Sequence, residues 1–213
     1  MMIVSCTKYP HMFAPMTIKG VTFKNRVFAS PITANRIVDH GYPTPEGIDA
    51  YETKARGGFA EVTVTESFID HEYAWRHEHG LDVWSNPMTT FHMESIMTLT
   101  EAIKAHGAVA SIEIDHGGGK ANPMFTSDHV SHGPSAIRAA GGYDVEPMSV
   151  DFLHEIADAY GKGAAVAKLA GFQMVTLHAG HGWLIHQFLS PLTNHRGTST
   201  AGALRIAAAS CWR

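Results

Sequence analysis

The sequence predicts an α/β fold built around a parallel β-sheet. Four short segments rich in apolar or β-branched residues recur along the chain, at 27–31, 60–66, 108–114 and 172–179. Each of the first three is followed by a segment with helical spacing of its apolar residues. Parallel neighbours need crossover connections of this kind. With 213 residues, 45% of them hydrophobic, the chain is long enough to bury the core of one domain.

The predicted helices carry their own start and stop signals. The three helical segments are 45–57, 87–105 and 148–170. Pro45 suits a first helical turn, and Ser149 is a plausible N-cap for the third helix. Glycine follows each segment closely, and Gly171 lies where a helix commonly ends. These signals support the alternation of strand and helix.

Periodicity alone does not separate an open doubly wound sheet from a barrel, but two details favour the barrel. No Gly-x-Gly-x-x-Gly follows the first strand, which weakens a dinucleotide-binding interpretation. Polar residues also gather just past the strands, as the active-site face of a barrel requires. They are Thr33, Asn35, Glu66, Glu113, Asp115, His116, His178 and His181. The long polar segment between the third strand and its helix is typical of a functional or mobile loop.

Composition excludes several classes of partner. The formal net charge is −4 and the sequence pI is about 6.4, so nucleic acid and anionic membranes are poor partners. No run of about eighteen apolar residues is present to span a bilayer, and the start lacks a signal peptide pattern. Cys6 and Cys211 lie at opposite ends of the chain, without disulfide or zinc-site spacing. We therefore expect a cytoplasmic protein.

Several motifs, in the correct order, resemble a known family. They are FAPMTIKGVTFKNRVFASPIT, AEVTVTE, SIEIDHGGGKA, HGPSAI and HAGHGWLIHQFLSPLTNHR. Together they resemble the N-terminal half of the old yellow enzyme family of NADH:flavin oxidoreductases, in particular its branch of 2,4-dienoyl-CoA and 2-enoate reductases. The resemblance implies a (β/α)₈ TIM barrel, with about its first four strands in residues 1–196.

The same resemblance implies a chemistry. The family binds FMN across the barrel mouth and takes hydride from NADH or NADPH. The flavin then delivers the hydride to the C=C bond of an α,β-unsaturated carbonyl or thioester, so the expected partner is a small enone or enoyl thioester. An oligomer is compatible with this picture. No metal ion is implied.

The resemblance also assigns roles to seven residues. Those expected to contact the cofactor are Pro31, Ile32 and Thr33 at the reactive edge, Ser67 near the pyrimidine, and Glu113, where the family commonly has glutamine. His178 and His181 match the pair that grips the substrate carbonyl oxygen, and His178 also lies near the cofactor.

Hydride addition explains why such a pair is useful. It pushes negative charge onto the carbonyl oxygen, so N–H donors aimed at that oxygen stabilise the transition state more than the ground state. Two imidazoles three residues apart, just past a strand, can converge on one small volume. Loss of one such donor typically costs about 2.7–4 kcal/mol in barrier height.

Three positions depart from the family pattern. Trp183 lies where the family usually has a proton-donating tyrosine, and an indole N–H cannot act as a general acid near neutral pH. Glu113 predicts either a lowered flavin potential or a protonated carboxyl. Gly119 replaces an arginine, with Lys120 next to it. His116 either approaches the flavin edge or is a buried histidine satisfied by the backbone.

From residue 197 the chain leaves the family pattern and reads GTSTAGALRIAAASCWR. A codon choice exists for which a shifted frame of this stretch reads NEYGGSLENRCRFLLA, which is how the family continues. We therefore expect 197–213 to be an out-of-frame tail, with an Ala-rich closing helix as the alternative. Because a barrel needs about 250 residues, four strands would expose sheet edges and an apolar barrel lining.

Two other functions stay open. One is a truncated, inactive fragment that survives as an interaction protein or as a remnant. Titration with FMN would distinguish it from an enzyme, because an enzyme of this family takes up FMN. The other is a metal-dependent barrel hydrolase that holds zinc with Asp115, His116, His178 and His181.

Overall fold

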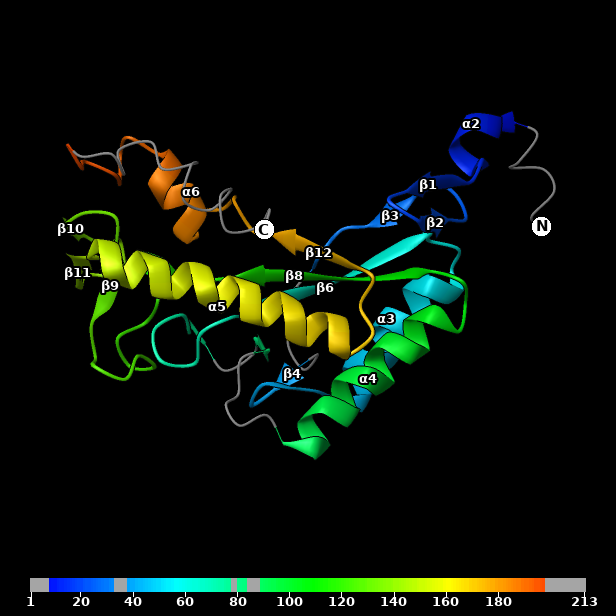
Figure 1. Cartoon of the computed structure of the whole chain (residues 1–213), viewed down its shortest axis with the longest axis horizontal. Helices are drawn as coiled ribbons and strands as arrows, with labels where there is room; N and C mark the ends of the chain where they lie inside the picture. Colours follow the sequence, from blue (N-terminus) through cyan, green and yellow to red (C-terminus); the bar gives the residue numbers. More distant parts are fainter. Residues whose placement is uncertain (1–7, 33–37, 78–79, 84–88, 198–213) are drawn as a thin grey trace.

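The computed structural model describes residues 8–32, 38–77, 80–83 and 89–197. Its centre is a parallel sheet with the strand order β12-β8-β6-β3 (Figure 1). The strands are β3 (Phe28–Ala29), β6 (Glu61–Phe68), β8 (Val109–Asp115) and β12 (Met174–Leu177). A short strand, β7 (Leu81–Asp82), extends the sheet beside the end of β6. Strands that are neighbours in the chain are thus neighbours in the sheet, which confirms the predicted α/β fold.

Three helices make the crossovers, as predicted. They are α3 (Pro45–Arg56), α4 (Thr90–Lys104) and α5 (Val150–Leu169), and Figure 1 shows them along the lower side of the sheet. Each begins at a hydroxyl that accepts a hydrogen bond from a backbone N–H of the first turn. These N-caps are Thr44, Thr89 and the predicted Ser149. Gly171 has a φ of +96°, as the predicted helix stop requires.

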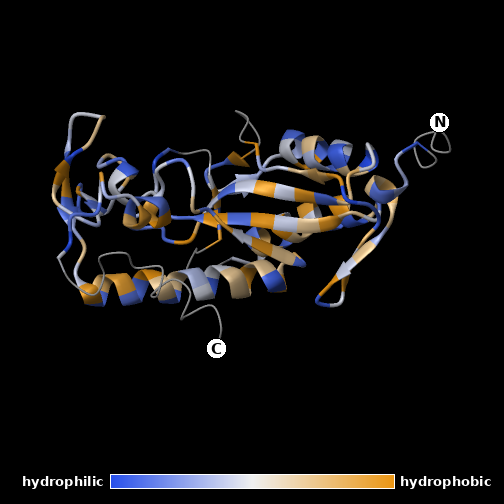
Figure 2. Cartoon of the chain, turned by 90° about the horizontal axis from the view of Figure 1, so that it is seen from above, coloured by the Kyte–Doolittle hydropathy of each residue, from blue (hydrophilic) through white to orange (hydrophobic). Residues whose placement is uncertain are grey.

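The two faces of the central strands differ in chemistry. Val64, Ile112 and Ile114 are fully buried in the main core, which also contains side chains of α3, α4 and α5. Register places Thr63 beside Ser111 on the opposite face, and Glu113 and Asp115 follow Ser111 at alternate positions on that face. Figure 2 shows this alternation as changes of colour along the central strands. The predicted apolar barrel lining therefore holds only at the start of β8, where Val109 packs in an apolar cluster. From Ser111 to Asp115 this inner face is polar.

The amino end of the sheet is closed by an N-terminal hairpin. It follows the short helix α2 (Pro10–Phe13) and consists of β1 (Met16–Ile18) and β2 (Val21–Phe23). Phe23 packs with Ala60 and Val109 at the start of β6 and β8. A second hairpin, β4 (Val38–Asp39) and β5 (Tyr42–Pro43), precedes α3.

The long polar segment after β8 is folded. The 3₁₀ turn η1 (Gly118–Lys120) leads into a small sheet with the order β10-β11-β9. Its strands are β9 (Ser131–Gly133), β10 (Ile137–Arg138) and β11 (Asp144–Pro147). The short helix α6 (Leu184–Leu189) follows β12 and contacts η1.

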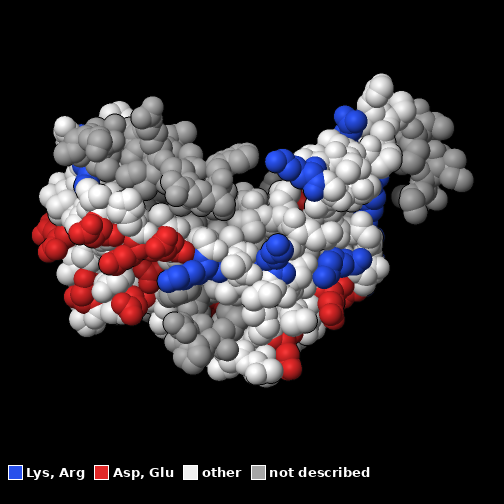
Figure 3. All heavy atoms as spheres, in the orientation of Figure 1, with Lys and Arg blue, Asp and Glu red and all other residues white. Residues whose placement is uncertain are grey.

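Charge is unevenly spread over the molecule. Figure 3 shows acidic side chains gathered over β11 and the start of α5 on the face in view. The exposed acids of these segments are Asp144, Glu146, Asp151, Glu155 and Asp158. Across the described ranges, no helix combines the length and the apolar content that crossing a membrane requires. The predicted out-of-frame tail, apart from Gly197, lies outside the described residues.

Candidate functional site

A cavity of about 520 Å³ lies at the carboxyl ends of the parallel strands. Its lining residues come from the segments that follow β3 and β12, from the second half of β6, from the end of β8, and from the loop after β6. They are Ser30, Pro31, Thr65, Glu66, Arg76, Glu113, Asp115, His178, His181 and Trp183. Strand ends of a barrel-type sheet are the usual place for an active site.

Four of the seven predicted site residues meet in this cavity. Pro31, Glu113, His178 and His181 all line it. Ile32 is 60% exposed and is not among the lining residues. Thr33 lies outside the described residues.

Ser67 is not in the cavity, and the predicted position of this residue is wrong. It lies inside β6, fully buried, and is paired in register with Ile114 of the main core. The cause is a β-bulge: the pairing of β6 with β8 shifts by one residue between Val64 and Ser67. The extra residue turns Ser67 to the outer face.

The same bulge presents two consecutive residues to the cavity. Thr65 and Glu66 lie opposite Glu113 and both line the cavity. Glu66 has a φ of +43°, a backbone conformation that few residues with side chains adopt. The backbone N–H of Thr65 donates to the hydroxyl of Tyr51 on α3, at 3.1 Å. Tyr51 thereby satisfies an N–H near the bulge that would otherwise be costly to bury.

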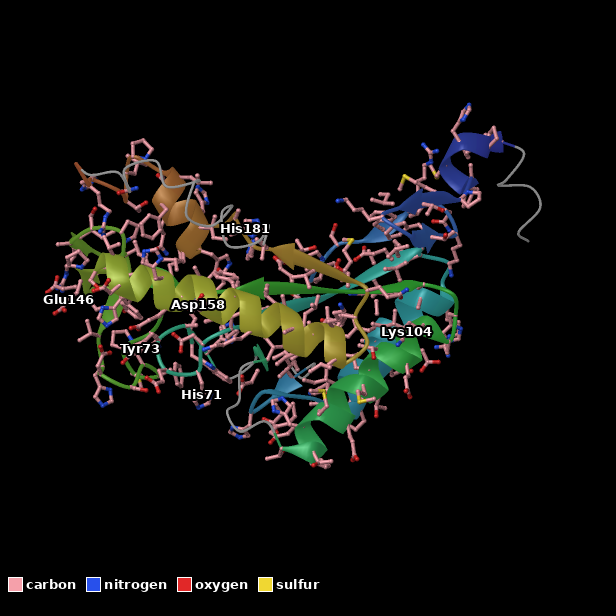
Figure 4. The ribbon with its side chains drawn as sticks, in the orientation of Figure 1. His71, Tyr73, Lys104, Glu146, Asp158 and His181 are labelled. Carbon is pink, nitrogen blue, oxygen red and sulfur yellow. The ribbon has the colours of Figure 1, made fainter. Side chains whose placement is uncertain are left out.

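His178 and His181 come together as predicted. Their ring centroids are 5.1 Å apart and the rings are nearly perpendicular, at 79°. Figure 4 shows His181 beside the tip of β12, across the sheet from α5. His181 has a φ of +53°, so two cavity residues, Glu66 and His181, have this unfavourable backbone conformation. Lys120 donates from Nζ to the carbonyl oxygen of His181 and so holds this turn.

Glu113 pairs with His178, and the two pKa shifts favour a neutral pair. Glu113 Oε1 lies 3.2 Å from His178 Nδ1. Burial raises the pKa of Glu113; the charge of Glu66 adds to this rise and His181 opposes it. Burial also lowers the pKa of His178, and His181 lowers it further. A protonated Glu113 would donate to Nδ1, leaving the ring proton of His178 on Nε2.

Trp183 both packs and lines the site. It is only 5% exposed and belongs to a small cluster with Phe68, Ala74 and Trp75. Its ring also lies 5.9 Å from that of His178. The guanidinium of Arg76 lies over the Trp183 ring, 5.7 Å from its centroid. The indole is thus a wall of the cavity, and Arg76 is a cation held beside it.

Gln187 on α6 ties the loop after β8 to the histidine turn. Its Nε2 donates to the carbonyl oxygens of Gly117 and Gly182, and its Oε1 accepts from Gly119 N–H. Gly119, where the family often has arginine, therefore serves a buried backbone contact. Nothing in the sequence pattern singled out Gln187.

His116 is a structural residue, the second of the two predicted alternatives. It is fully buried and does not line the cavity. Its Nδ1 accepts from Gly118 N–H at 2.9 Å, and its Nε2 lies 3.5 Å from Asp70 Oδ2. The zinc interpretation needs His116 in the site. Among the described residues, no group of three or more His, Cys, Asp or Glu is placed to hold a metal ion.

A second cavity, of about 760 Å³, shares Arg76 with the first. Its basic lining residues are Arg76, Lys120, Arg138 and His186, and none of the described residues that line it is an aspartate or a glutamate. Arg138 pairs with Asp144 at 2.8 Å. This cavity lies among η1, the β10–β11 hairpin and α6, and it is suited to an anionic group.

Comparisons with known proteins agree with this architecture. Residues 11–208 match the sequence pattern of the NADH:flavin oxidoreductase / NADH oxidase family. The NADPH dehydrogenases of Bacillus pumilus and Bacillus subtilis are each 33% identical over 193 residues, which is 90% of this chain. The match covers 55% of each relative, so the chain spans about half the length of these proteins.

Solved structures show the same fold. An old yellow enzyme from Pichia sp. superposes with a TM-score of 0.80 at 21% identity, over 94% of this chain and 54% of that one. The old yellow enzyme homologue from Zymomonas mobilis gives 0.79 at 25% identity, over 95% of this chain and 57% of that one. The predicted partial barrel is confirmed, and the chain belongs to the NADH:flavin oxidoreductase / NADH oxidase family.

Proposed function

We propose that this chain forms the N-terminal half of the barrel of an FMN-dependent NAD(P)H oxidoreductase. Its substrate would be an α,β-unsaturated carbonyl or thioester, reduced at the C=C bond. One observation carries the proposal: two imidazoles meet 5.1 Å apart in a cavity at the strand ends of a flavin oxidoreductase fold.

The cavity residues fit the ring system of a flavin. The pyrimidine edge of a flavin has one N–H between two carbonyl oxygens. Carboxyl groups of Glu66 and Glu113 line the cavity and can accept from that N–H. A protonated Glu113 that donates to His178 keeps a carbonyl oxygen that can accept from this N–H, as the amide oxygen of the glutamine that it replaces can. Bound FMN would supply a hydride donor next to the imidazole pair.

The histidines would hold the oxygen that becomes negative. A neutral His178 with its proton on Nε2 is one N–H donor. His181, whose ring is nearly perpendicular to that of His178, would supply the second N–H donor. Trp183 and Arg76 border the same volume, so they limit the water and the substrate shapes that enter. Donors fixed by the fold stabilise developing charge without reorganisation.

The phosphate of FMN finds little support in this cavity. Among its described lining residues, Arg76 is the one Lys or Arg. The adjoining basic cavity suits the phosphates of NAD(P)H or of a coenzyme thioester better. The names of the Bacillus relatives favour NADPH as the reductant. We propose that the remaining phosphate contacts come from the second half of the barrel, which lies outside the described residues.

FMN titration of the purified chain tests this function against an inactive remnant. We expect quenching of flavin fluorescence with a dissociation constant in the micromolar range. His178→Ala removes one of the two donors and should weaken binding of 2-cyclohexen-1-one to the FMN-loaded chain. His154→Ala, on the exposed side of α5, is the matched control and should have no effect. A soluble, folded chain that takes up no FMN would contradict the proposal and favour the remnant.

A further inference from the structure

Asp115 is a buried carboxyl group at the base of the cavity. It is the last residue of β8 and lines the cavity together with Glu113, two residues earlier on the same face. None of its surface is exposed. Within the described part of the chain, neither of its side-chain oxygens has a hydrogen-bond partner. The resemblance to the family gave Asp115 no role, so its chemistry needs its own explanation.

An unpartnered carboxylate in such a place is costly, whereas a neutral carboxylic acid is not. Burial raises the pKa of Asp115 well above its usual value, and Glu66 and Glu113 raise it further whenever they are ionised. The other ionisable groups around the cavity are His178, His181 and Arg76. The neutral form carries an O–H donor, which a carboxylate lacks.

The reaction also requires an acid, and the tyrosine that usually supplies the proton in the family is replaced here. After hydride reaches the β-carbon, the α-carbon must receive a proton. Trp183 cannot supply it, because an indole N–H is a donor but not an acid near neutral pH. His178 and His181 are engaged with the oxygen in the proposed function, and a protonated Glu113 donates its proton to His178 Nδ1. A neutral Asp115 lines the same cavity with an O–H for which the described residues offer no acceptor.

We propose that Asp115 is the catalytic acid that protonates the α-carbon of the substrate. The inference rests on the proposed function. Hydride, supplied by NAD(P)H through FMN, forms the new C–H bond at the β-carbon, and the π electrons move to the carbonyl oxygen held by the imidazoles. The resulting enolate then takes the Asp115 proton: a C–H bond forms at the α-carbon and the O–H bond breaks. Water returns the proton to the carboxylate.

The first experiment asks whether Asp115 is protonated, and it needs neither cofactor nor turnover. Infrared difference spectra of the full chain, wild type minus Asp115→Asn, isolate the C=O stretch of this carboxyl. We expect the band of a neutral acid at pH 7. Asp151→Asn, on the exposed first turn of α5, is the matched control and should remove only carboxylate bands. A carboxylate signal for Asp115 at pH 7 would overturn the inference.

The second experiment separates the two half-reactions of the FMN-loaded full chain. Asp115→Asn should slow oxidation of the reduced protein by 2-cyclohexen-1-one about 10²–10⁴-fold, the usual contribution of a general acid. Reduction by NADPH needs no such proton and should be unchanged. Adding Trp183→Tyr to Asp115→Asn should restore part of the lost rate, because tyrosine is an acid.

The outcomes are distinguishable. If wild-type protein is not oxidised by the enone, the proposed function fails, and the role of Asp115 in that reaction fails with it. If wild type and Asp115→Asn are oxidised equally fast, the function stands and the assignment of Asp115 is overturned.

Discussion

The outer and inner faces of the sheet are made by the same strands but have opposite chemistry. Outward residues such as Ile112 and Ile114 are buried in an apolar core with three helices. The residues between and beyond them, Glu113 and Asp115, line a cavity and carry raised pKa values. The period of two along a strand allows one segment to build both. Stability therefore comes mainly from one face, and the ionisable groups of the candidate site are on the other.

The largest expected effect is on the outer face. Ile112→Ala removes a fully buried side chain and should lower the free energy of unfolding by about 2–5 kcal/mol, from lost burial and the cavity that remains. Urea denaturation measures this loss. A cost below about 1 kcal/mol would show that the outer face is not the main source of stability.

A change at the rim of the inner face should affect activity more than stability. His178→Ala removes one N–H donor, so the barrier to enone reduction should rise by about 2.7–4 kcal/mol. Steady-state kinetics measures the change in kcat/KM. Because His178 is not part of the core, the midpoint of urea unfolding should move little. A large loss of stability with unchanged kinetics would reverse the assignment of the two faces.

Asp115→Asn should make the protein more stable at neutral pH. The pKa of Asp115 is raised on folding, so the folded state holds a proton that the unfolded state, with a pKa of about 3.9, loses. The wild type therefore loses stability as pH rises above about 4, by up to ~1.4 kcal/mol per unit, until the folded pKa is reached. Asn removes this slope. Urea unfolding from pH 4 to 8 should show that the free energy of unfolding of the variant, relative to that of the wild type, increases as pH rises. If the two free energies depend on pH in the same way, Asp115 is not the buried neutral acid of the inner face.

The smallest effect concerns the bulge that joins the two faces. Tyr51→Phe removes the acceptor of the Thr65 N–H and should cost about 1 kcal/mol in unfolding free energy. Tyr9→Phe, at a residue that is 50% exposed, is the control and should cost nothing measurable. If Tyr51→Phe also leaves the free energy of unfolding unchanged, the hydroxyl does not support the bulge.

Much of this architecture was predictable from local signals. Strands β6 and β8 and helices α3, α4 and α5 begin and end within three residues of their predicted bounds, because β-branched runs, caps and glycine stops are local. The pair His178 and His181 was predictable because both follow one strand. The bulge was not predictable, since it depends on how β6 pairs with β8. Because of its shift of one residue, Thr65 and Glu66 line the cavity in place of the predicted Ser67.

Other features depend on distant parts of the chain. The two- to four-residue strands β9 to β11 are too short to show a period. Arg76 reaches the site through its position over Trp183, a contact between loops more than a hundred positions apart in the sequence. The lack of a partner for Asp115 is a property of the folded surroundings, and no sequence pattern reports it.

The imidazole pair is the centre of this account, and ¹⁵N NMR of the histidine rings tests it most directly. Spectra of the FMN-loaded chain would be recorded with and without 2-cyclohexen-1-one, with signals assigned by single substitutions. We predict that the ring nitrogens of both His178 and His181 shift together on binding while those of His154 stay unchanged. A bound enone that moves neither ring, or only one, would contradict the claim that the two histidines hold a single oxygen.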